Sequence, residues 1–280
     1  GSSGAGTTTV KVAFEHIFLR DGLNPAVIEG DSFHAYDRVA MKEAMQKAEE
    51  QGNTNFSHFG PQANLFDKLE DTFRTYSETG ACERRYYLHS EEEAEPFGQK
   101  PGEFTPWEPI LPGTDLLFYE GLHGGVVDGT TNVAQFVDML IGVVPLVNLE
   151  WIQKIHRDCA QRGYSAEAVT DTILRRMYDY VHYITPQFSR TDINFQRVPT
   201  VDTSNPFIAR DIPTPDESFV VIRFRDPDKQ NIDFPYLLNM LDGSFMSRRN
   251  SIVVPGGKMG FAMEIILAPI IESMMEAKKT

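Results

Sequence analysis

The sequence has few cysteines and few basic residues for its length. Among 280 residues there are two cysteines, Cys82 and Cys159, too few for a disulfide scaffold or a four-ligand zinc site. Lysine and arginine total 26 against 40 acidic residues, which gives a formal net charge of −14. Such a surface repels nucleic acid and anionic lipid, so we expect neither as a partner. An anionic substrate would therefore have to meet a local cluster of basic side chains.

Long apolar runs and internal repeats are also missing. No stretch approaches the roughly 20 apolar residues that a membrane helix needs, and no signal peptide is visible. With two reduced thiols, these absences favour a cytoplasmic protein. The 41% hydrophobic content is enough for a substantial core. Short apolar runs alternate with helical patterns and no clear linker separates them, which predicts one α/β domain over residues 1–280.

The chain opens on GSSGAGTTT, residues 1–9, which partly matches the phosphate-binding pattern G-x-x-x-x-G-K-[ST]: Gly1, Gly6 and Thr8 fit it. Thr7 stands where the lysine should be, and the strand that normally precedes the loop is absent. An expression remnant is the alternative, but the segment runs directly into an amphipathic helical pattern, which favours the functional reading. We expect a strand and its lead-in, about ten residues, before Gly1 in the natural protein. A loop of this kind offers backbone N–H groups to a phosphate, here from Gly1, Ser2, Ser3, Gly4, Ala5, Gly6, Thr7 and Thr8.

The segment EGDSFHAYDR, residues 29–38, follows an apolar run that predicts a strand. In open α/β sheets ligands bind just past such strands. Asp31, His34 and Arg38 are spaced i, i+3 and i+7, so they share one face if the segment is helical. A carboxylate beside a hydroxyl substrate can act as general base, and histidine with arginine can hold a phosphate. Taken singly, each is more simply a capping or solvated residue.

Two further segments carry charge at informative positions. Glu120 closes the apolar run DLLFYEG, where P-loop enzymes place the acid that serves Mg²⁺, and the hydroxyl of Thr8 could ligate the same ion. In WIQKIHRDCAQRG, residues 151–163, the spacing predicts a cationic stripe on one helix face, with a further arginine in the next helix. The stripe could meet ATP and a second phosphate, although a solvated basic face is the commoner outcome. Its members are Lys154, Arg157, Asp158, Arg162 and, in the next helix, Arg175.

Taken together, these segments resemble the bacterial-type phosphoribulokinases, within the wider phosphoribulokinase and uridine kinase group. The resemblance extends through VVPLVNLEWIQKIHRDCAQRGYSAEAVTDTILRRM, TDINFQRVPTVDTSNPFIAR and RRNSIVVPG, and so spans essentially the whole chain. It implies a P-loop kinase-like mixed sheet flanked by helices, with the first strand missing from this sequence. It also implies Mg²⁺- and ATP-dependent phosphorylation of the 1-hydroxyl of ribulose 5-phosphate. The product would be ribulose 1,5-bisphosphate, the carbon dioxide acceptor of the Calvin cycle.

The resemblance also implies roles for individual residues. Asp31 matches the catalytic base, Glu120 the acid that serves the metal, and Asp158 a second acid important for turnover. The positions that match sugar-phosphate ligands are His34, Arg38 and Arg162. Basic positions near the transferring phosphate or ATP are matched by Lys154, Arg157 and Arg175. Because the loop has no lysine, Lys154 is the candidate for the cation at the β- and γ-phosphates.

Regulation and assembly are implied in the same way. The bacterial branch is a homo-octamer that NADH activates and AMP inhibits, and Arg223 and Arg248 match arginines linked to that response. Two alternatives remain open at this stage. A kinase for another small molecule, such as uridine, would need a base-binding site in place of the second phosphate site. A catalytically inactive paralogue acting as a regulatory subunit would not need Asp31, Glu120 and Asp158 together.

Overall fold

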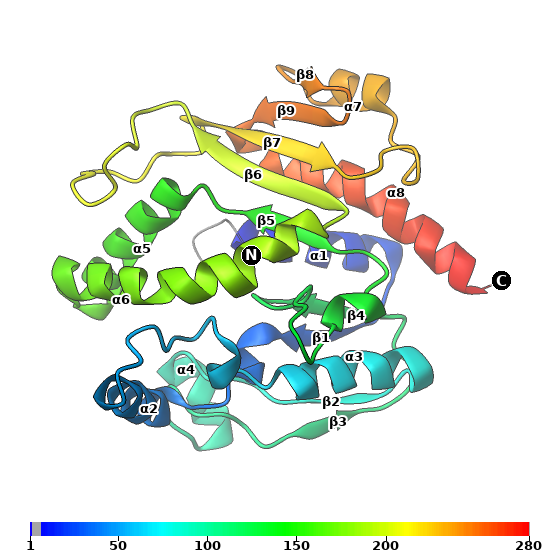
Figure 1. Ribbon diagram of the computed structural model, residues 1–280. Coiled ribbons are helices and arrows are strands. Elements are labelled where there is room, and N and C mark those ends of the chain that lie inside the picture. Colours follow the sequence, from blue (N-terminus) through cyan, green and yellow to red (C-terminus); the bar gives the residue numbers. More distant parts are fainter. Residues whose placement is uncertain (2–6, 280) are drawn as a thin grey trace. The chain divides into compact units, whose positions relative to one another are not determined.

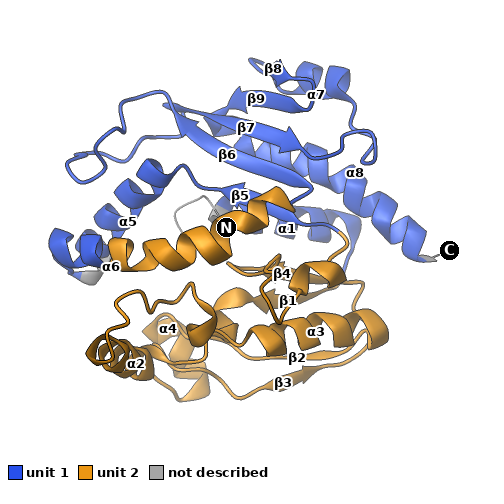
Figure 2. Cartoon of the chain, viewed as in Figure 1, with its two compact units in different colours: residues 1–23, 139–171, 191–280 blue, residues 24–138, 172–190 orange. Residues whose placement is uncertain are grey.

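The structure, a computed structural model, describes residue 1 and residues 7–279, with the backbone alone at residues 7, 8, 161, 162 and 279. The chain divides into two compact units (Figure 2). Unit 1 comprises residues 1–23, 139–171 and 191–280, and unit 2 comprises residues 24–138 and 172–190. The single domain over residues 1–280 stays a prediction.

Unit 1 is built on a five-stranded sheet in the order β5-β6-β7-β9-β8 (Figure 1). β5 pairs parallel with β6, and the other neighbours pair antiparallel. Side chains of β7 alternate between buried and exposed along its length, as the alternating run ESFVVIRF predicts. The strands are β5 (Ile141–Val144), β6 (Ile193–Pro199), β7 (Ser218–Phe224), β8 (Phe245–Arg248) and β9 (Ser251–Pro255).

The helices of unit 1 include α1 and α8, which pack against each other (Figure 1). The sequence pattern predicts a last amphipathic helix from about Lys258, and this helix starts at Met259 and contains Pro269 in its interior. The helices are α1 (Thr7–Asp21), α5 (Val147–Arg162), α7 (Phe234–Met240) and α8 (Met259–Lys279). A further helix, α6 (Ala166–Asp179), belongs to unit 1 up to residue 171 and to unit 2 from residue 172. Among the described residues, no helix is long and apolar enough to cross a membrane.

Unit 2 contains a parallel pair, β1 with β4, and an antiparallel pair, β2 with β3. Its core gathers apolar side chains of β1, α3 and the loop after β4, among them Ile28, Leu69 and Val126. The strands are β1 (Pro25–Glu29), β2 (Cys82–Arg84), β3 (Glu108–Ile110) and β4 (Leu116–Glu120). The helices are α2 (Arg38–Glu50), α3 (Phe66–Thr79) and α4 (Glu91–Ala94), followed in the chain by the second part of α6.

Local sequence signals set several boundaries in this unit. The Asp37 side chain accepts a hydrogen bond from the backbone N–H of Ala40 at 2.7 Å, so it caps α2 as its position predicts. The helix ends before Gly52, whose φ of 82° lies in the left-handed region that favours glycine. The predicted α/β fold, a mixed sheet with flanking helices, is confirmed.

Two predictions from local sequence pattern are wrong. The apolar and aromatic run RRYYLHS predicts a strand, but β2 ends at Arg84, and the only pairing beyond it in this run is an isolated bridge from Tyr87 to Phe104. The acidic segment from Ser90 to Gly113, rich in proline and glycine, predicts one long surface loop, but it contains α4 and β3. Strand pairing depends on partners distant in the sequence, so a local apolar run could not reveal either outcome.

Candidate active site

The ends of β1 and β4 bring two acidic residues to one edge of the sheet in unit 2. The strands are parallel and in register, so Glu29 lies opposite Glu120. Just beyond them Gly30 and Gly121 touch: a Cβ on Gly30 would lie 2.8 Å from the Gly121 Cα and 2.5 Å from the Tyr119 hydroxyl. Only glycine fits such a close backbone approach. This contact fixes the start of the turn that carries the predicted base.

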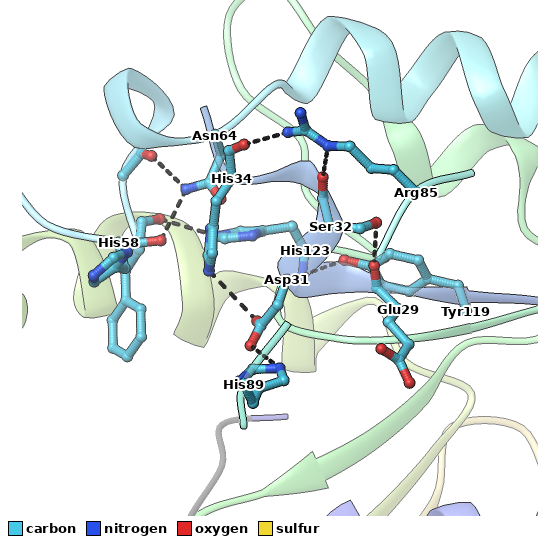
Figure 3. A network of polar contacts seen from close by, with 12 residues as sticks. Glu29, Asp31, Ser32, His34, His58, Asn64, Arg85, His89, Tyr119 and His123 are labelled. Carbon is cyan, nitrogen blue, oxygen red and sulfur yellow. Dashed lines mark hydrogen bonds and ion pairs between the residues drawn. The ribbon is translucent and has the colours of Figure 1, made fainter. Parts of the chain in front are cut away.

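Asp31 lies in a 3-10 turn, Gly30–Phe33, directly after β1. Its Oδ1 is 3.4 Å from His34 Nε2 and its Oδ2 is 3.6 Å from His89 Nε2 (Figure 3). The side chain is 44% exposed, so substrate atoms can reach it. Desolvation raises the pKa of Asp31, but the hydrogen bond from His34 and the charges of nearby histidines outweigh it and lower the pKa to about 2. The carboxylate is therefore ionised at neutral pH.

The Asn64 side chain determines which ring nitrogen of His34 acts as its hydrogen-bond donor. The Asn64 Nδ2 donates to the carbonyl oxygens of His58 and Gly60, at 2.8 and 2.7 Å. Its Oδ1 consequently faces His34 Nδ1 at 2.8 Å, and Nδ1 must carry a proton to donate to it. Contact of the opposite nitrogen, Nε2, with the Asp31 carboxylate is then attractive only if Nε2 also carries a proton. The buried His34 ring is thereby oriented with Nε2 toward Asp31.

The structure brings together two of the three residues expected on one helix face. His34 lies against Asp31, but through a 3-10 turn that ends at Phe33, and α2 begins separately at Arg38. The continuous helix is excluded because His34 is extended and pairs with Asn64 in an isolated bridge. Arg38 Nη2 donates to the carbonyl oxygen of His89 at 3.3 Å, so this arginine lies next to the segment that carries the second histidine contact.

In unit 1, α5 carries a compact cluster of opposite charges. Lys154 Nζ is 2.5 Å from Asp158 Oδ2, and Arg157 Nε is 3.0 Å from Asp158 Oδ1. The Asp158 side chain is only 5% exposed, against 14% for Lys154 and 28% for Arg157. Burial raises the pKa of Asp158, but the two cations outweigh this and hold it below its ordinary value. This face of the helix is not the solvated basic face that such charge runs usually form.

The predicted phosphate loop is described only at its edges. Gly1 lies against β5, and a Cβ there would come within 2.5 Å of the Val143 carbonyl oxygen, so the first position requires glycine. Ser2, Ser3, Gly4, Ala5 and Gly6 lie outside the described residues. The helix α1 begins at Thr7, and the side chains of Thr7 and Thr8 also lie outside the description.

The other predicted site residues lie on several elements. Arg175 lies in the part of α6 that belongs to unit 2, and it donates a hydrogen bond to the Glu49 carboxylate of the same unit at 3.1 Å. Arg162 is the last residue of α5, and its side chain lies outside the described part of the chain. In unit 1, Arg223 of β7 and Arg248 of β8 both pair in register with Ser251 of the intervening β9. The two arginines thus share one row of the sheet.

Sequence reasoning missed the residues that surround Asp31 from elsewhere in the chain. His89 contacts the carboxylate, Asn64 orients His34, and Arg85 bonds the turn itself (Figure 3). His89 and Arg85 belong to the run wrongly predicted as a strand. No spacing rule links these positions to residue 31, so only the folded chain reveals them.

Within residues 1 and 7–279, no group of three or more His, Cys, Asp or Glu side chains is placed to hold a metal ion. A Mg²⁺ ion bound with nucleotide phosphates needs only one or two protein carboxylates and keeps several waters. Glu120, at the strand edge opposite Glu29, carries a carboxylate of the kind that binds Mg²⁺. The donor set therefore fits a magnesium ion shared with a nucleotide.

Comparison with known proteins places this geometry in a family. The family described as Phosphoribulokinase / Uridine kinase matches residues 1–204. A chromosomal phosphoribulokinase of Cupriavidus necator is 66% identical over 279 residues, covering 100% of this chain and 95% of that protein. A phosphoribulokinase of Nitrobacter vulgaris is 61% identical, covering 100% and 96%. The solved structure of a phosphoribulokinase from Rhodobacter spheroides superposes with a TM-score of 0.91 at 55% identity, covering 100% of this chain and 96% of that one.

These likenesses and the mixed α/β fold define the chain as an ATP-dependent kinase. It belongs to the phosphoribulokinase and uridine kinase family. The family predicted from the sequence is thereby confirmed, together with its bacterial type.

Proposed function

We propose that this chain transfers the γ-phosphoryl group of ATP to the 1-hydroxyl of ribulose 5-phosphate, forming the ribulose 1,5-bisphosphate of the Calvin cycle. Its full-length identity to curated bacterial phosphoribulokinases supports this substrate. The observation in the structure that carries the proposal is the Asp31 carboxylate, ionised, 44% exposed and in contact with His34. A carboxylate base beside a histidine that can donate to a phosphate suits a hydroxyl substrate that also carries a phosphate.

In this proposal Asp31 accepts the hydroxyl proton. A carboxyl with a pKa of about 2 is a weak base, but phosphoryl transfer passes through a loose transition state in which the nucleophile is deprotonated late. Orienting the hydroxyl toward the phosphorus therefore matters more than early proton removal. A substrate that drew His34 away from Asp31 would also raise the proton affinity of the carboxylate, because the hydrogen bond from His34 is what lowers it most.

The phosphate of the sugar is assigned to His34, Arg38 and Arg162. Histidine and arginine donors suit a phosphate dianion, and they would provide the local positive charge that a chain of net charge −14 otherwise lacks. The Asn64 contact supports the role of His34, because it keeps a proton on Nδ1 and leaves Nε2 facing the carboxylate.

The nucleotide is assigned to the phosphate loop, Gly1 to Thr8, with Lys154, Arg157 and Arg175. Lys154 would replace the lysine that the loop lacks, and Asp158 would align the Lys154 and Arg157 side chains through the contacts on α5. Cations held in place before the reaction stabilise the charge that spreads over the equatorial oxygens of the phosphoryl group. Thr8 and Glu120 are the proposed protein ligands of Mg²⁺, which when bound neutralises charge on the phosphates.

Regulation and assembly belong to the same proposal. Arg223 and Arg248 are proposed to respond to NADH as activator and AMP as inhibitor. Their common row across β7, β9 and β8 supports a shared anion site. We further propose a cytoplasmic homo-oligomer, an octamer as in the bacterial branch.

An ADP-release assay tests the substrate. With ATP and Mg²⁺, ribulose 5-phosphate is expected to stimulate ADP release strongly and uridine not at all, and NADH is expected to raise the rate further. Stimulation by uridine alone would favour the nucleoside kinase alternative. Absence of stimulation by either substrate, with intact ATP binding, would favour the inactive paralogue.

A further inference from the structure

The turn that carries Asp31 is held from outside by one guanidinium group. Within the turn, Ser32 Oγ donates to the Glu29 carbonyl oxygen at 2.6 Å, and the backbone N–H of His34 donates to the Asp31 carbonyl oxygen at 3.2 Å. The carbonyl oxygens of Ser32 and His34 point instead to Arg85. They accept from Arg85 Nε and Nη2 respectively, each at 2.7 Å (Figure 3).

These two bonds flank the functional side chains. The Ser32 carbonyl follows Asp31 by one residue, and the other accepting carbonyl belongs to His34 itself. A planar guanidinium presents its N–H groups in a rigid fork, so the two bonds fix the separation of the carbonyls as well as their positions. The side chains of Asp31 and His34, which are 3.4 Å apart, are carried by this same stretch of backbone.

Arg85 is itself held in place by aromatic rings. Its guanidinium carbon is 3.7 Å from the centre of the Phe104 ring and 4.7 Å from that of Trp107. Trp107 also packs edge-on against Phe33, the last residue of the turn. In the part of the chain that the structure describes, Arg85 forms no ion pair with a carboxylate. Desolvation lowers the pKa of Arg85 to about 10, so it still carries its charge at neutral pH.

We propose that Arg85 is a positioning residue for the transfer reaction, holding the Ser32 and His34 carbonyl oxygens so that Asp31 and His34 keep their mutual geometry. This inference rests on the proposed function of these two residues. Arg85 acts on Asp31 and His34 through the backbone carbonyl oxygens of the turn, without contacting the substrate. Its removal is therefore expected to lower turnover more than nucleotide affinity.

The test compares Arg85→Lys with Arg84→Lys. Arg84 is the matched control, because it is adjacent in sequence, pairs with Glu108 and lies over the Tyr86 ring without bonding the turn. Lysine keeps the charge but cannot span two carbonyls as a fork. We expect Arg85→Lys to lower kcat with ribulose 5-phosphate about 100-fold, since small displacements of reacting groups cost this much, with KM for ATP unchanged. Arg84→Lys should retain the wild-type kcat.

Chemical rescue separates positioning from folding. In Arg85→Ala, millimolar guanidinium ion can occupy the space over Phe104 and Trp107 and bond the same carbonyls, so we expect it to restore part of kcat. It should not change the wild type or Arg84→Ala. If Arg85→Lys keeps the wild-type kcat, or if its loss accompanies a lowered Tm and guanidinium restores nothing in Arg85→Ala, the inference is wrong.

A readout without substrate separates failure of the inference from failure of the proposed function. Hydrogen–deuterium exchange of peptides covering residues 30–35 should increase in Arg85→Lys and stay unchanged in Arg84→Lys. If the wild type does not phosphorylate ribulose 5-phosphate, the proposed function fails, while this exchange result still decides whether Arg85 holds the turn. Equal exchange in both variants would overturn the inference even if the enzyme is active.

Discussion

Two clusters in the molecule each combine a carboxylate with basic side chains, one around Asp158 on α5 and one around Asp31 in the turn after β1. They differ in the burial of the carboxylate and in where its partners come from. On α5 the carboxylate is buried between two basic side chains of the same helix, the adjacent Arg157 and Lys154 one turn away. In the turn the carboxylate is 44% exposed and faces histidines, one of them from a segment more than 50 residues away. One cluster is local to a single helix, and the other is assembled from segments that are distant in the sequence.

This difference separates two tasks. Stabilising a transferring phosphoryl group needs positive charge that is in place before the reaction and does not depend on pH. Accepting a proton from a hydroxyl needs a carboxylate that substrate can reach and whose proton affinity responds to its neighbours. We therefore assign the α5 cluster to the nucleotide and the turn to the acceptor hydroxyl, a division that substitutions in each cluster can test.

The largest effect is expected at the base. Asp31→Asn keeps the shape but cannot accept the hydroxyl proton, so kcat should fall about 10²–10⁴-fold while ATP binding persists. Steady-state kinetics and ATP titration measure the two quantities. Asp37→Asn is the matched control, because asparagine caps α2 as well as aspartate and should leave kcat unchanged. Near-normal kcat in Asp31→Asn would exclude Asp31 as the base.

A comparable but smaller effect is expected on α5. Lys154→Met removes the cation assigned to the β- and γ-phosphates, and kcat should fall about 10²–10³-fold. The exposed Lys229, also in unit 1, provides the control Lys229→Met. Because the lysine is a permanent cation, the loss should be the same at each pH between 6 and 9. A loss that varies with pH over this range would contradict the assignment of fixed charge to α5.

The contrast between the clusters also explains what the sequence could predict. The i, i+3 and i+4 spacing of Lys154, Arg157 and Asp158 predicts that they share one helix face, and the structure places them on one helix, α5. The strand-end position of Glu120 followed in the same way from a short apolar run. Both signals are local, and both are present in the structure.

The surroundings of Asp31 could not be predicted, because they depend on tertiary contacts. Asn64, Arg85 and His89 reach the turn from the start of α3 and from the irregular segment after β2. The same reason accounts for the strands β6 and β8, which the sequence pattern did not indicate, and for the run RRYYLHS, whose apolar residues do not form a strand. The chemical roles of the site residues stay predictions until variants are measured.

A moderate effect is expected for the sugar phosphate. Arg38→Ala should raise KM for ribulose 5-phosphate about tenfold, as loss of one charge-assisted hydrogen bond does, with little change in KM for ATP. Arg74→Ala is the control, since Arg74 is an exposed arginine of unit 2 that pairs with Asp71 and Glu78. If only KM for ATP rises in Arg38→Ala, Arg38 belongs to the nucleotide and the division between the clusters fails.

The smallest effect on turnover, with a distinct effect on stability, is expected at His123. Burial lowers the pKa of His123 to about 3, against an ordinary value of 6.5, although its hydrogen bond to the Phe59 carbonyl opposes this. The folded state therefore stays neutral where the unfolded chain takes up a proton, and folding stability falls as pH drops from 6.5 toward 3. His123→Gln keeps a donor for the carbonyl and should flatten this dependence in urea unfolding.

The control for this prediction is the exposed His16 in unit 1, which pairs with Glu264. His16→Gln should leave the acid dependence of stability nearly as in the wild type. An equally steep loss of stability between pH 6.5 and 3 in His123→Gln would show that the buried histidine does not set the acid sensitivity of unit 2.

The central claim is the identity and position of the phosphorylated group, and ³¹P NMR of the product measures both. After incubation of the wild-type chain with ATP, Mg²⁺ and ribulose 5-phosphate, we expect a second phosphomonoester resonance. It should couple to the C1 protons and grow in step with ADP. Release of inorganic phosphate without that resonance, or a phosphomonoester formed only when uridine is supplied, would contradict the account.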